Sequence, residues 1–273
     1  VSLPELVHSL RTMQPKVVFA ESSKSMAALR GEMGDLQLDT KWVLLTGEAA
    51  GAMTLEELRA RGRSSALPFA ALQADLRPED PAILYMTSGA TGAPKMGVVS
   101  HHAVVSNVDM GPKVLDLGPD DRTIAFLPSA HIAQRVAVQM LMIRHGVQVY
   151  FSESLARLPL ELKAVRPTMF LAPPRVWERM YSTIATEIRK RGPATRQLFY
   201  MAVGAGAKAY RYKQEGRPVP GYLARLVKLF DRPVYSKIRE RLGGEIRVAI
   251  SGSAPLAKDL ADFFGAIGLP MVE

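Results

Sequence analysis

Short apolar runs alternate with amphipathic stretches along the chain. The runs at 16–20, 42–45 and 82–86 have the length expected of buried strands. Between them, residues 1–15 and 55–61 repeat apolar positions every three or four residues, which predicts helices. Because strands that alternate with helices favour βαβ units, we predict an α/β fold of mostly parallel sheets flanked by helices.

The same alternation continues through the second half of the chain. Strands are predicted at 123–127, 147–151, 167–172 and 245–250, and helices at 132–144, 159–166, 176–189 and 256–264. A last apolar stretch, 269–272, predicts the start of one more strand, directly before the final residue, Glu273. Since half a strand cannot complete a sheet, we expect residues 1–273 to form an incomplete domain.

Composition limits the class of protein. The chain has 273 residues, of which 48% are hydrophobic and 22% are charged, as in globular proteins with a substantial core. It contains no uncharged apolar run of the ~18 residues that a transmembrane helix needs. The absence of cysteine excludes disulfides, thiolate metal sites and cysteine catalysis, and favours a cytoplasmic location.

Positive charge is concentrated in one segment, residues 187–241. The whole chain has a net charge of +9, and this segment alone holds fourteen basic and four acidic residues. Such a segment suggests an acidic partner surface, which can be anionic lipid, a phosphorylated ligand or nucleic acid. Of these we expect a peripheral contact with the inner face of an anionic membrane, and no nucleic-acid partner. The alternative is a set of solvated helix faces without a partner.

A loop rich in glycine and hydroxyl residues follows the strand at 82–86. From Thr87 to Lys95 it reads Thr-Ser-Gly-Ala-Thr-Gly-Ala-Pro-Lys. Glycines let backbone N–H groups approach an anion, hydroxyls donate hydrogen bonds, and the lysine adds charge, so the loop suits a polyphosphate. A Walker A loop is excluded, because Pro94 stands where the second glycine belongs and Met96 follows the lysine.

Two other patterns are interpreted as structural. Residues 204–209, Gly-Ala-Gly-Ala-Lys-Ala, have the glycine spacing of a dinucleotide-binding loop, but no clear strand precedes them and no acidic residue lies at the required offset. His101 and His102 have no further ligands at metal-binding spacing, and we interpret them as the start of a helix.

The motif from Thr87 to Lys95 resembles the signature of the adenylate-forming, AMP-binding enzymes, [YF]-[ST]-[ST]-G-[ST]-T-G-x-P-K-G, from which Ala90 and Met96 depart. Three further segments resemble the long-chain fatty-acid–CoA ligases of that superfamily: Leu-Pro-Ser-Ala-His-Ile at 127–132, Pro-Arg-Val-Trp-Glu-Arg at 174–179, and Ser-Gly-Ser-Ala-Pro-Leu at 251–256, whose family form is S-G-[GS]-A-P-L. Their order along the chain is similar to that in the large N-terminal domain of such a ligase.

The resemblance implies a reaction and a site. In these enzymes of lipid metabolism a fatty acid and ATP form an acyl-adenylate, from which CoA displaces AMP. The resemblance assigns the phosphates to Thr87, Ser88, Gly89, Thr91, Gly92 and Lys95, with Lys95 catalytic and Thr87 able to reach Mg²⁺. It assigns the adenine and acyl pocket to Ser251, Gly252, Ser253, Ala254 and Pro255, and the acyl substrate to His131 and Trp177.

Several alternatives stay open. His131 can be a satisfied structural histidine, and Trp177 a core aromatic. The whole chain can instead be another adenylate-forming ligase, or a non-catalytic relative that binds nucleotide, lipid or membrane. By the resemblance, a magnesium-binding glutamate and a C-terminal lid domain with a second lysine would follow Glu273, so we expect the 273 residues to be inactive alone.

Overall fold

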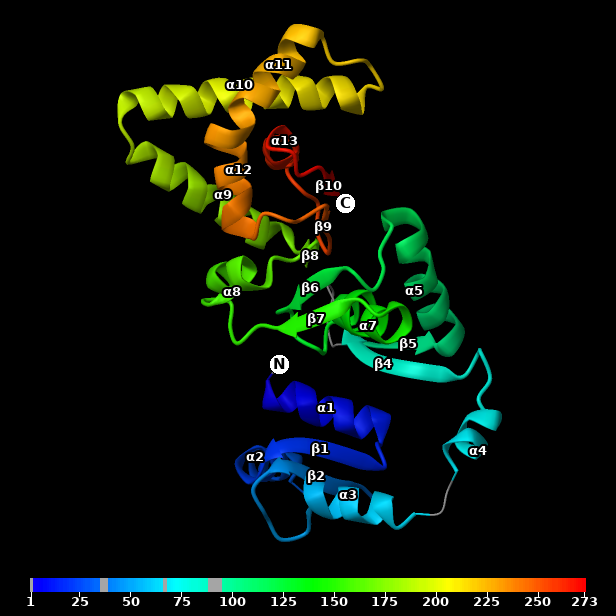
Figure 1. Cartoon of the computed structure of the whole chain (residues 1–273). Helices are drawn as coiled ribbons and strands as arrows, with labels where there is room; N and C mark the ends of the chain where they lie inside the picture. The colour runs from blue at the N-terminus through cyan, green and yellow to red at the C-terminus, as the bar shows by residue number, and fades with distance from the viewer. Residues whose placement is uncertain (1, 35–38, 66–67, 88–94) are drawn as a thin grey trace. The chain divides into compact units, whose positions relative to one another are not determined.

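The computed structural model describes residues 2–34, 39–65, 68–87 and 95–273. The chain divides into two compact units, Val1–His102 and Ala103–Glu273. Figure 1 shows both units, coloured along the chain. No helix in these described ranges combines the length and apolar character needed to cross a membrane.

The first unit contains a parallel three-stranded sheet. β1 (Val17–Ser22), β2 (Lys41–Thr46) and β3 (Met53–Thr54) pair in this order. Helices α1 (Leu3–Met13), α2 (Ser23–Met33) and α3 (Leu55–Arg63) alternate with the strands. Both α1 and α3 begin with a capping box, in which a hydroxyl residue and a glutamate satisfy each other's backbone N–H groups. The cap of α3 is Thr54.

A β-hairpin completes the first unit. After α4 (Phe69–Ala74), β4 (Pro81–Thr87) pairs with β5 (Lys95–Ser100), and among the described strands this is the one antiparallel pair. Gly97 lies opposite Tyr85, and a Cβ at Gly97 would lie 2.6 Å from the tyrosine ring. The ring thus covers the glycine. α5 (His101–Leu115) begins at the histidine pair, as expected.

The second unit contains parallel strands that share one direction. β6 (Arg122–Ala125) pairs with β7 (Gln148–Phe151), and β8 (Met169–Ala172), β9 (Val248–Ser251) and β10 (Met271–Val272) form a second sheet in the order β10-β9-β8. The N–H of Thr168 donates to the carbonyl of Arg122, at 2.9 Å, and Phe126 stacks on Phe170. These contacts align β6 with β8, so the carboxyl ends of the strands lie at a common edge.

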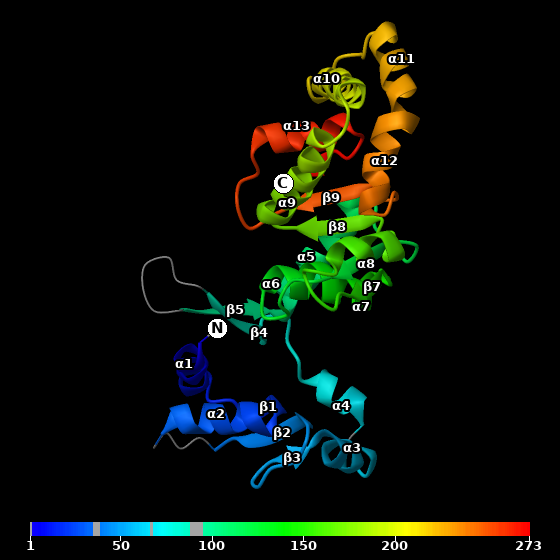
Figure 2. The same ribbon diagram turned by 90° about the vertical axis from the view of Figure 1, so that its left-hand side faces the viewer.

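Helices pack around these strands. The stretch predicted as one helix consists of α6 (Ile132–Gln134), the π-helical η1 (Arg135–Met140) and α7 (Leu141–His145). The other helices are α8 (Leu158–Val165), α9 (Pro174–Arg189), α10 (Pro193–Gln214), α11 (Gly221–Phe230), the run η2 (Asp231–Tyr235), α12 (Ser236–Arg239) and η3 (Glu240–Leu242), and α13 (Lys258–Ala266). Figure 2 shows α9, α12 and α13 next to the β8–β9 sheet, with α10 and α11 beyond them.

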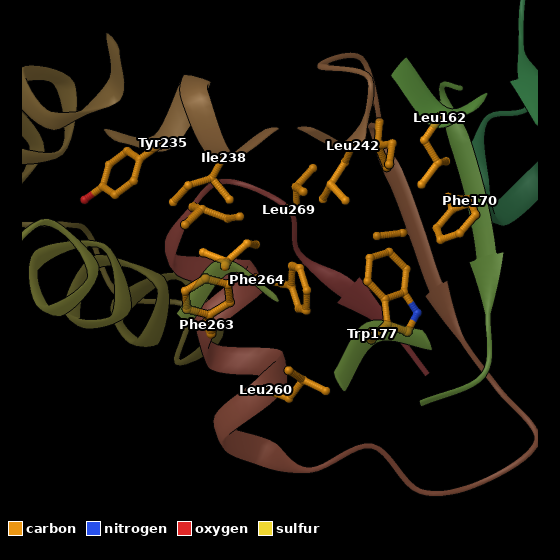
Figure 3. Packing of buried hydrophobic residues seen from close by; sticks show 14 of the residues in the cluster. Leu162, Phe170, Trp177, Tyr235, Ile238, Leu242, Leu260, Phe263, Phe264 and Leu269 are labelled. Carbon is orange, nitrogen blue, oxygen red and sulfur yellow. The ribbon is translucent and has the colours of Figure 1, made fainter. Parts of the chain in front are cut away.

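The core of this unit lies between the sheet and these helices. Figure 3 shows its side chains, among them Phe170 from β8, Trp177 from α9 and Phe264 from α13. Gly206 lets α10 approach α13, because a Cβ at this position would lie 2.2 Å from the carbonyl oxygen of Ala266. In the pattern at 204–209, Gly206 therefore serves helix packing, whereas Gly204 is exposed.

A buried aspartate joins the amino ends of β6, β8 and β9. Asp121 is 4% exposed and accepts hydrogen bonds from the Thr168 hydroxyl (2.6 Å), the Gly118 N–H (2.9 Å) and the Arg247 guanidinium (2.6 Å). Burial by itself would raise the pKa of Asp121, but these hydrogen bonds and the arginine charge hold that pKa below its usual value. The ionised carboxylate therefore stabilises the fold.

We expect Asp121→Asn to lower the free energy of unfolding by about 2 kcal/mol at neutral pH, because Arg247 and Thr168 lose a charged acceptor. Since the pKa is lower in the folded state, this contribution is complete above the unfolded pKa of about 3.9 and is lost as the pH falls through the folded value. Urea unfolding from pH 7 to pH 3 should show the gap between variant and unmodified chain closing with acid. A gap that stays constant would contradict this, and the exposed neighbour variant Asp120→Asn should change little.

Candidate functional site

The predicted phosphate loop connects the two strands of the hairpin. Thr87 is the last residue of β4 and Lys95 the first of β5, and the two are paired directly opposite each other. Opposed residues in an antiparallel ladder have Cα atoms about 4.5–5.5 Å apart. The two ends of the motif are therefore brought together, with Lys95 exposed. The predicted residues Ser88, Gly89, Thr91 and Gly92 lie outside the described residues.

The second predicted segment, Ser251–Pro255, begins at the last residue of β9. Ser251 pairs with Ala172 of β8 and is 1% exposed. Its hydroxyl oxygen has no hydrogen-bond partner in the described part of the chain. Leaving a buried hydroxyl unpaired costs about 1–3 kcal/mol. Because ligands of open α/β sheets bind beyond the carboxyl ends of the strands, this position suits a binding residue.

The loop after Ser251 has an unusual backbone. Ser253 has a φ of 72°, which glycine adopts readily and other residues rarely. The N–H of Leu256 donates to a carboxylate oxygen of Glu273, at 3.1 Å, which ties the end of the loop to the residue after β10. The loop is thus held between the ends of β9 and β10.

Trp177 contacts the same ends of β8 and β9. Its ring is fully buried, and its centroid lies 5.2 Å from that of Phe170 and 5.0 Å from that of Phe264, both edge-on. Its indole N–H lies 3.2 Å from the carbonyl oxygens of both Ala172 and Ile250 and donates to them. The structure therefore places Trp177 beside Ser251. Its burial is what a core aromatic requires, and a role toward an acyl substrate stays a prediction.

His131 lies between β6 and α6, on the same edge of the sheet. Its side chain is exposed, and its Nδ1 accepts a hydrogen bond from the N–H of Ala133, at 3.2 Å. It thereby caps α6. His131 thus has a structural role, which the sequence analysis gave as the alternative. Its contact with a substrate carboxylate stays a prediction.

Gln134 is a candidate that sequence reasoning missed. It is 1% exposed, and its side-chain oxygen has no hydrogen-bond partner among the described residues. It follows His131 by three residues. The helical spacing in the sequence could have indicated it, because Gln134 lies four residues before Val138 and seven before Leu141, on the same helical face as these two buried residues. It is a polar residue at a core-facing position close to the carboxyl edge.

The described residues provide no cage for a metal ion. In the ranges that the structure describes, no three His, Asp or Glu side chains converge. Mg²⁺ commonly binds through one or two protein oxygens together with substrate phosphates and waters. Magnesium bound together with nucleotide phosphates therefore stays a prediction.

Comparison with a solved structure defines the class of fold. The adenylation domain of a carboxylate reductase from Mycobacterium chelonae superposes with a TM-score of 0.68 at 21% identity, covering 99% of this chain and 41% of that one. The fold is that of an adenylate-forming enzyme domain, as predicted, with mostly parallel sheets flanked by helices.

Sequence comparisons define the family. The model of the AMP-binding enzyme family matches residues 1–273, and the chain therefore belongs to that family. The long-chain-fatty-acid–CoA ligase FadD15 of Mycobacterium tuberculosis is 31% identical over 270 residues, 97% of this chain and 44% of the relative. The peroxisomal long chain acyl-CoA synthetase 7 of Arabidopsis thaliana is 32% identical over 218 residues, 80% of this chain and 29% of the relative. The predicted resemblance is confirmed, and the chain spans less than half of either relative.

Proposed function

We propose that this chain supplies the nucleotide-phosphate loop and part of the acyl-adenylate pocket of a long-chain fatty-acid–CoA ligase. In the complete reaction, a fatty-acid carboxylate attacks the α-phosphate of ATP and pyrophosphate leaves. The CoA thiol then attacks the acyl carbon, and AMP leaves as the thioester forms. The observation that carries the proposal is the hairpin register, which joins Thr87 and Lys95 at the mouth of the loop.

The two predicted segments have separate tasks in the reaction. Backbone N–H groups and hydroxyls between Thr87 and Gly92 hold the β- and γ-phosphates, and Lys95 offsets their charge as pyrophosphate leaves. Mg²⁺, when bound with the nucleotide, neutralises further phosphate charge. Ser251 and the loop to Pro255 lie along the adenine and the acyl group, with His131 toward the carboxylate and Trp177 toward the acyl chain. The unpaired Ser251 hydroxyl supports this placement.

We expect Lys95→Gln to weaken the binding of Mg²⁺–ATP by about 10- to 150-fold, because a charge-assisted hydrogen bond contributes about 1.5–3 kcal/mol. Isothermal titration calorimetry on the 273-residue chain measures the effect. AMP, which lacks the β- and γ-phosphates, should lose far less affinity. Lys41→Gln, an exposed lysine at the start of β2 in the same unit, is the matched control. Equal losses for ATP and AMP, or no measurable ATP binding to the unmodified chain, would contradict the proposal.

We also propose that the 273-residue polypeptide does not catalyse adenylation by itself. The proposal is supported by its coverage of 44% and 29% of the lengths of the two relatives. Exchange of labelled pyrophosphate into ATP, with and without palmitate, should stay at background. Palmitate-dependent exchange by the pure polypeptide would refute this part of the proposal while leaving the phosphate loop in place.

A further inference from the structure

The basic segment 187–241 keeps most of its positive charge unpaired in the folded chain. Three of its four acidic residues pair with arginines of the same segment: Glu187 with Arg241, Glu215 with Arg217, and Asp231 with Arg239. The other eleven Lys and Arg side chains form no ion pair with any residue that the structure describes. The segment therefore presents a strongly positive surface.

Helix α11 carries exposed apolar side chains within this positive surface. Tyr222, Leu226 and Leu229 follow one another at spacings of four and three residues, which places them in one stripe. They are 58%, 38% and 67% exposed. The neighbouring face of the helix, with Leu223 and Phe230, is buried. The core therefore uses the buried face of α11, and the exposed stripe does not contribute to it.

Cations border this apolar stripe. Arg225 and Lys228 project from α11 on the side away from the buried face, and both are exposed. On α10, the Lys208 ammonium lies 3.4 Å from the hydroxyl of Tyr222 and donates to it. Figures 1 and 2 show α10 and α11 side by side at the end of the second unit that is farthest from β6 and β7. Stripe and cations therefore share an accessible end of this unit.

We propose that the α10–α11 pair docks this protein on an anionic lipid surface. Tyr222, Leu226 and Leu229 enter the boundary between headgroups and acyl chains, and the flanking cations contact lipid phosphates. An apolar stripe beside Lys and Arg on one helix is typical of interfacial membrane contact. A nucleic acid would use the cations, but it would leave the aliphatic stripe without a function. The proposal does not depend on the ligase function.

Co-sedimentation of the full 273-residue chain with lipid vesicles tests the proposal. Vesicles of 70% phosphatidylcholine and 30% phosphatidylserine should bind the chain at least ten times more strongly than pure phosphatidylcholine. Arg225→Gln/Lys228→Gln should lower the partition coefficient about 25-fold, since each cation near an anionic surface contributes about fivefold. The control Lys24→Gln/Lys258→Gln removes the same charge from exposed positions outside the segment, and should lower it less than about threefold.

A second variant tests the apolar stripe with the charge unchanged. Tyr222→Ala/Leu229→Ala should lower the partition coefficient about tenfold, because both side chains lose apolar burial in the lipid. Circular dichroism checks that each variant keeps its helices. Equal binding to neutral and anionic vesicles, or equal losses in the two charge variants, would overturn the proposal. The proposal would also be overturned if the chain bound single-stranded RNA but not vesicles, and if the Tyr222 and Leu229 substitutions left the RNA binding unchanged.

Discussion

Gly206→Ala should destabilise the second unit by about 3 kcal/mol, at the upper end of the usual cost of overpacking. The new Cβ would lie 2.2 Å from the carbonyl oxygen of Ala266 and 3.1 Å from its Cα. Both atoms belong to the backbone of α13, so no side chain can rotate away. Either α13 moves outward or α10 bends. In both cases Phe263 and Phe264, which α13 places in the core, lose packing.

Gly204 offers a matched control on the same helix. A Cβ at Gly204 meets no described atom within 4 Å, and the residue is exposed. Because alanine favours a helix interior over glycine by about 0.5–1 kcal/mol, Gly204→Ala should stabilise the chain. Urea unfolding of the two variants should therefore shift the midpoint in opposite directions. A shift of the same sign and size in both would show that helix propensity, and not the α10–α13 approach, decides the effect.

The sequence predicted local features well, because they depend on local spacing. Helical periodicity predicted α9 and α13, and the sequence around the glycine pattern at 204–209 excluded a nucleotide site there. The order of the motifs was also enough to predict the family, and the comparisons confirm that prediction. These inferences need only the side-chain periods of helices and strands and the chemistry of short motifs.

Features that depend on pairing across the chain were beyond prediction. The Asp121 cluster joins residues separated by 47 and 126 positions, and no local pattern encodes that contact. The sequence likewise indicated the strand before the phosphate loop, but not the antiparallel register that sets Thr87 opposite Lys95. The lack of a hydrogen-bond partner for the Ser251 hydroxyl depends on which residues surround it in the folded chain. Long-range packing decides all three.

Substitution of Trp177 should have the largest effect on stability. Trp177→Ala removes a fully buried ring and should cost about 3–5 kcal/mol. Trp177→Phe keeps most of the apolar volume, but it leaves the carbonyls of Ala172 and Ile250 without their indole donor, which should cost about 1–3 kcal/mol. Trp42→Phe is the control, because that buried indole has no hydrogen bond to a described residue. Urea unfolding should rank the three variants in this order, and a Trp177→Ala chain as stable as Trp42→Phe would contradict the core role.

The same contacts limit any gating role for Trp177. To move aside for an acyl chain, the ring must break its hydrogen bonds to β8 and β9 and leave Phe170 and Phe264. The binding of the substrate would have to supply the free energy that these lost contacts cost. The chain has two tryptophans, so Trp42→Phe leaves Trp177 as the sole indole reporter. Its fluorescence should be that of a buried indole and should stay unchanged when palmitate and ATP are added. A red shift that depends on palmitate would show that the ring leaves the core, and would make Trp177 a moving gate of the acyl path instead of a fixed wall that faces it.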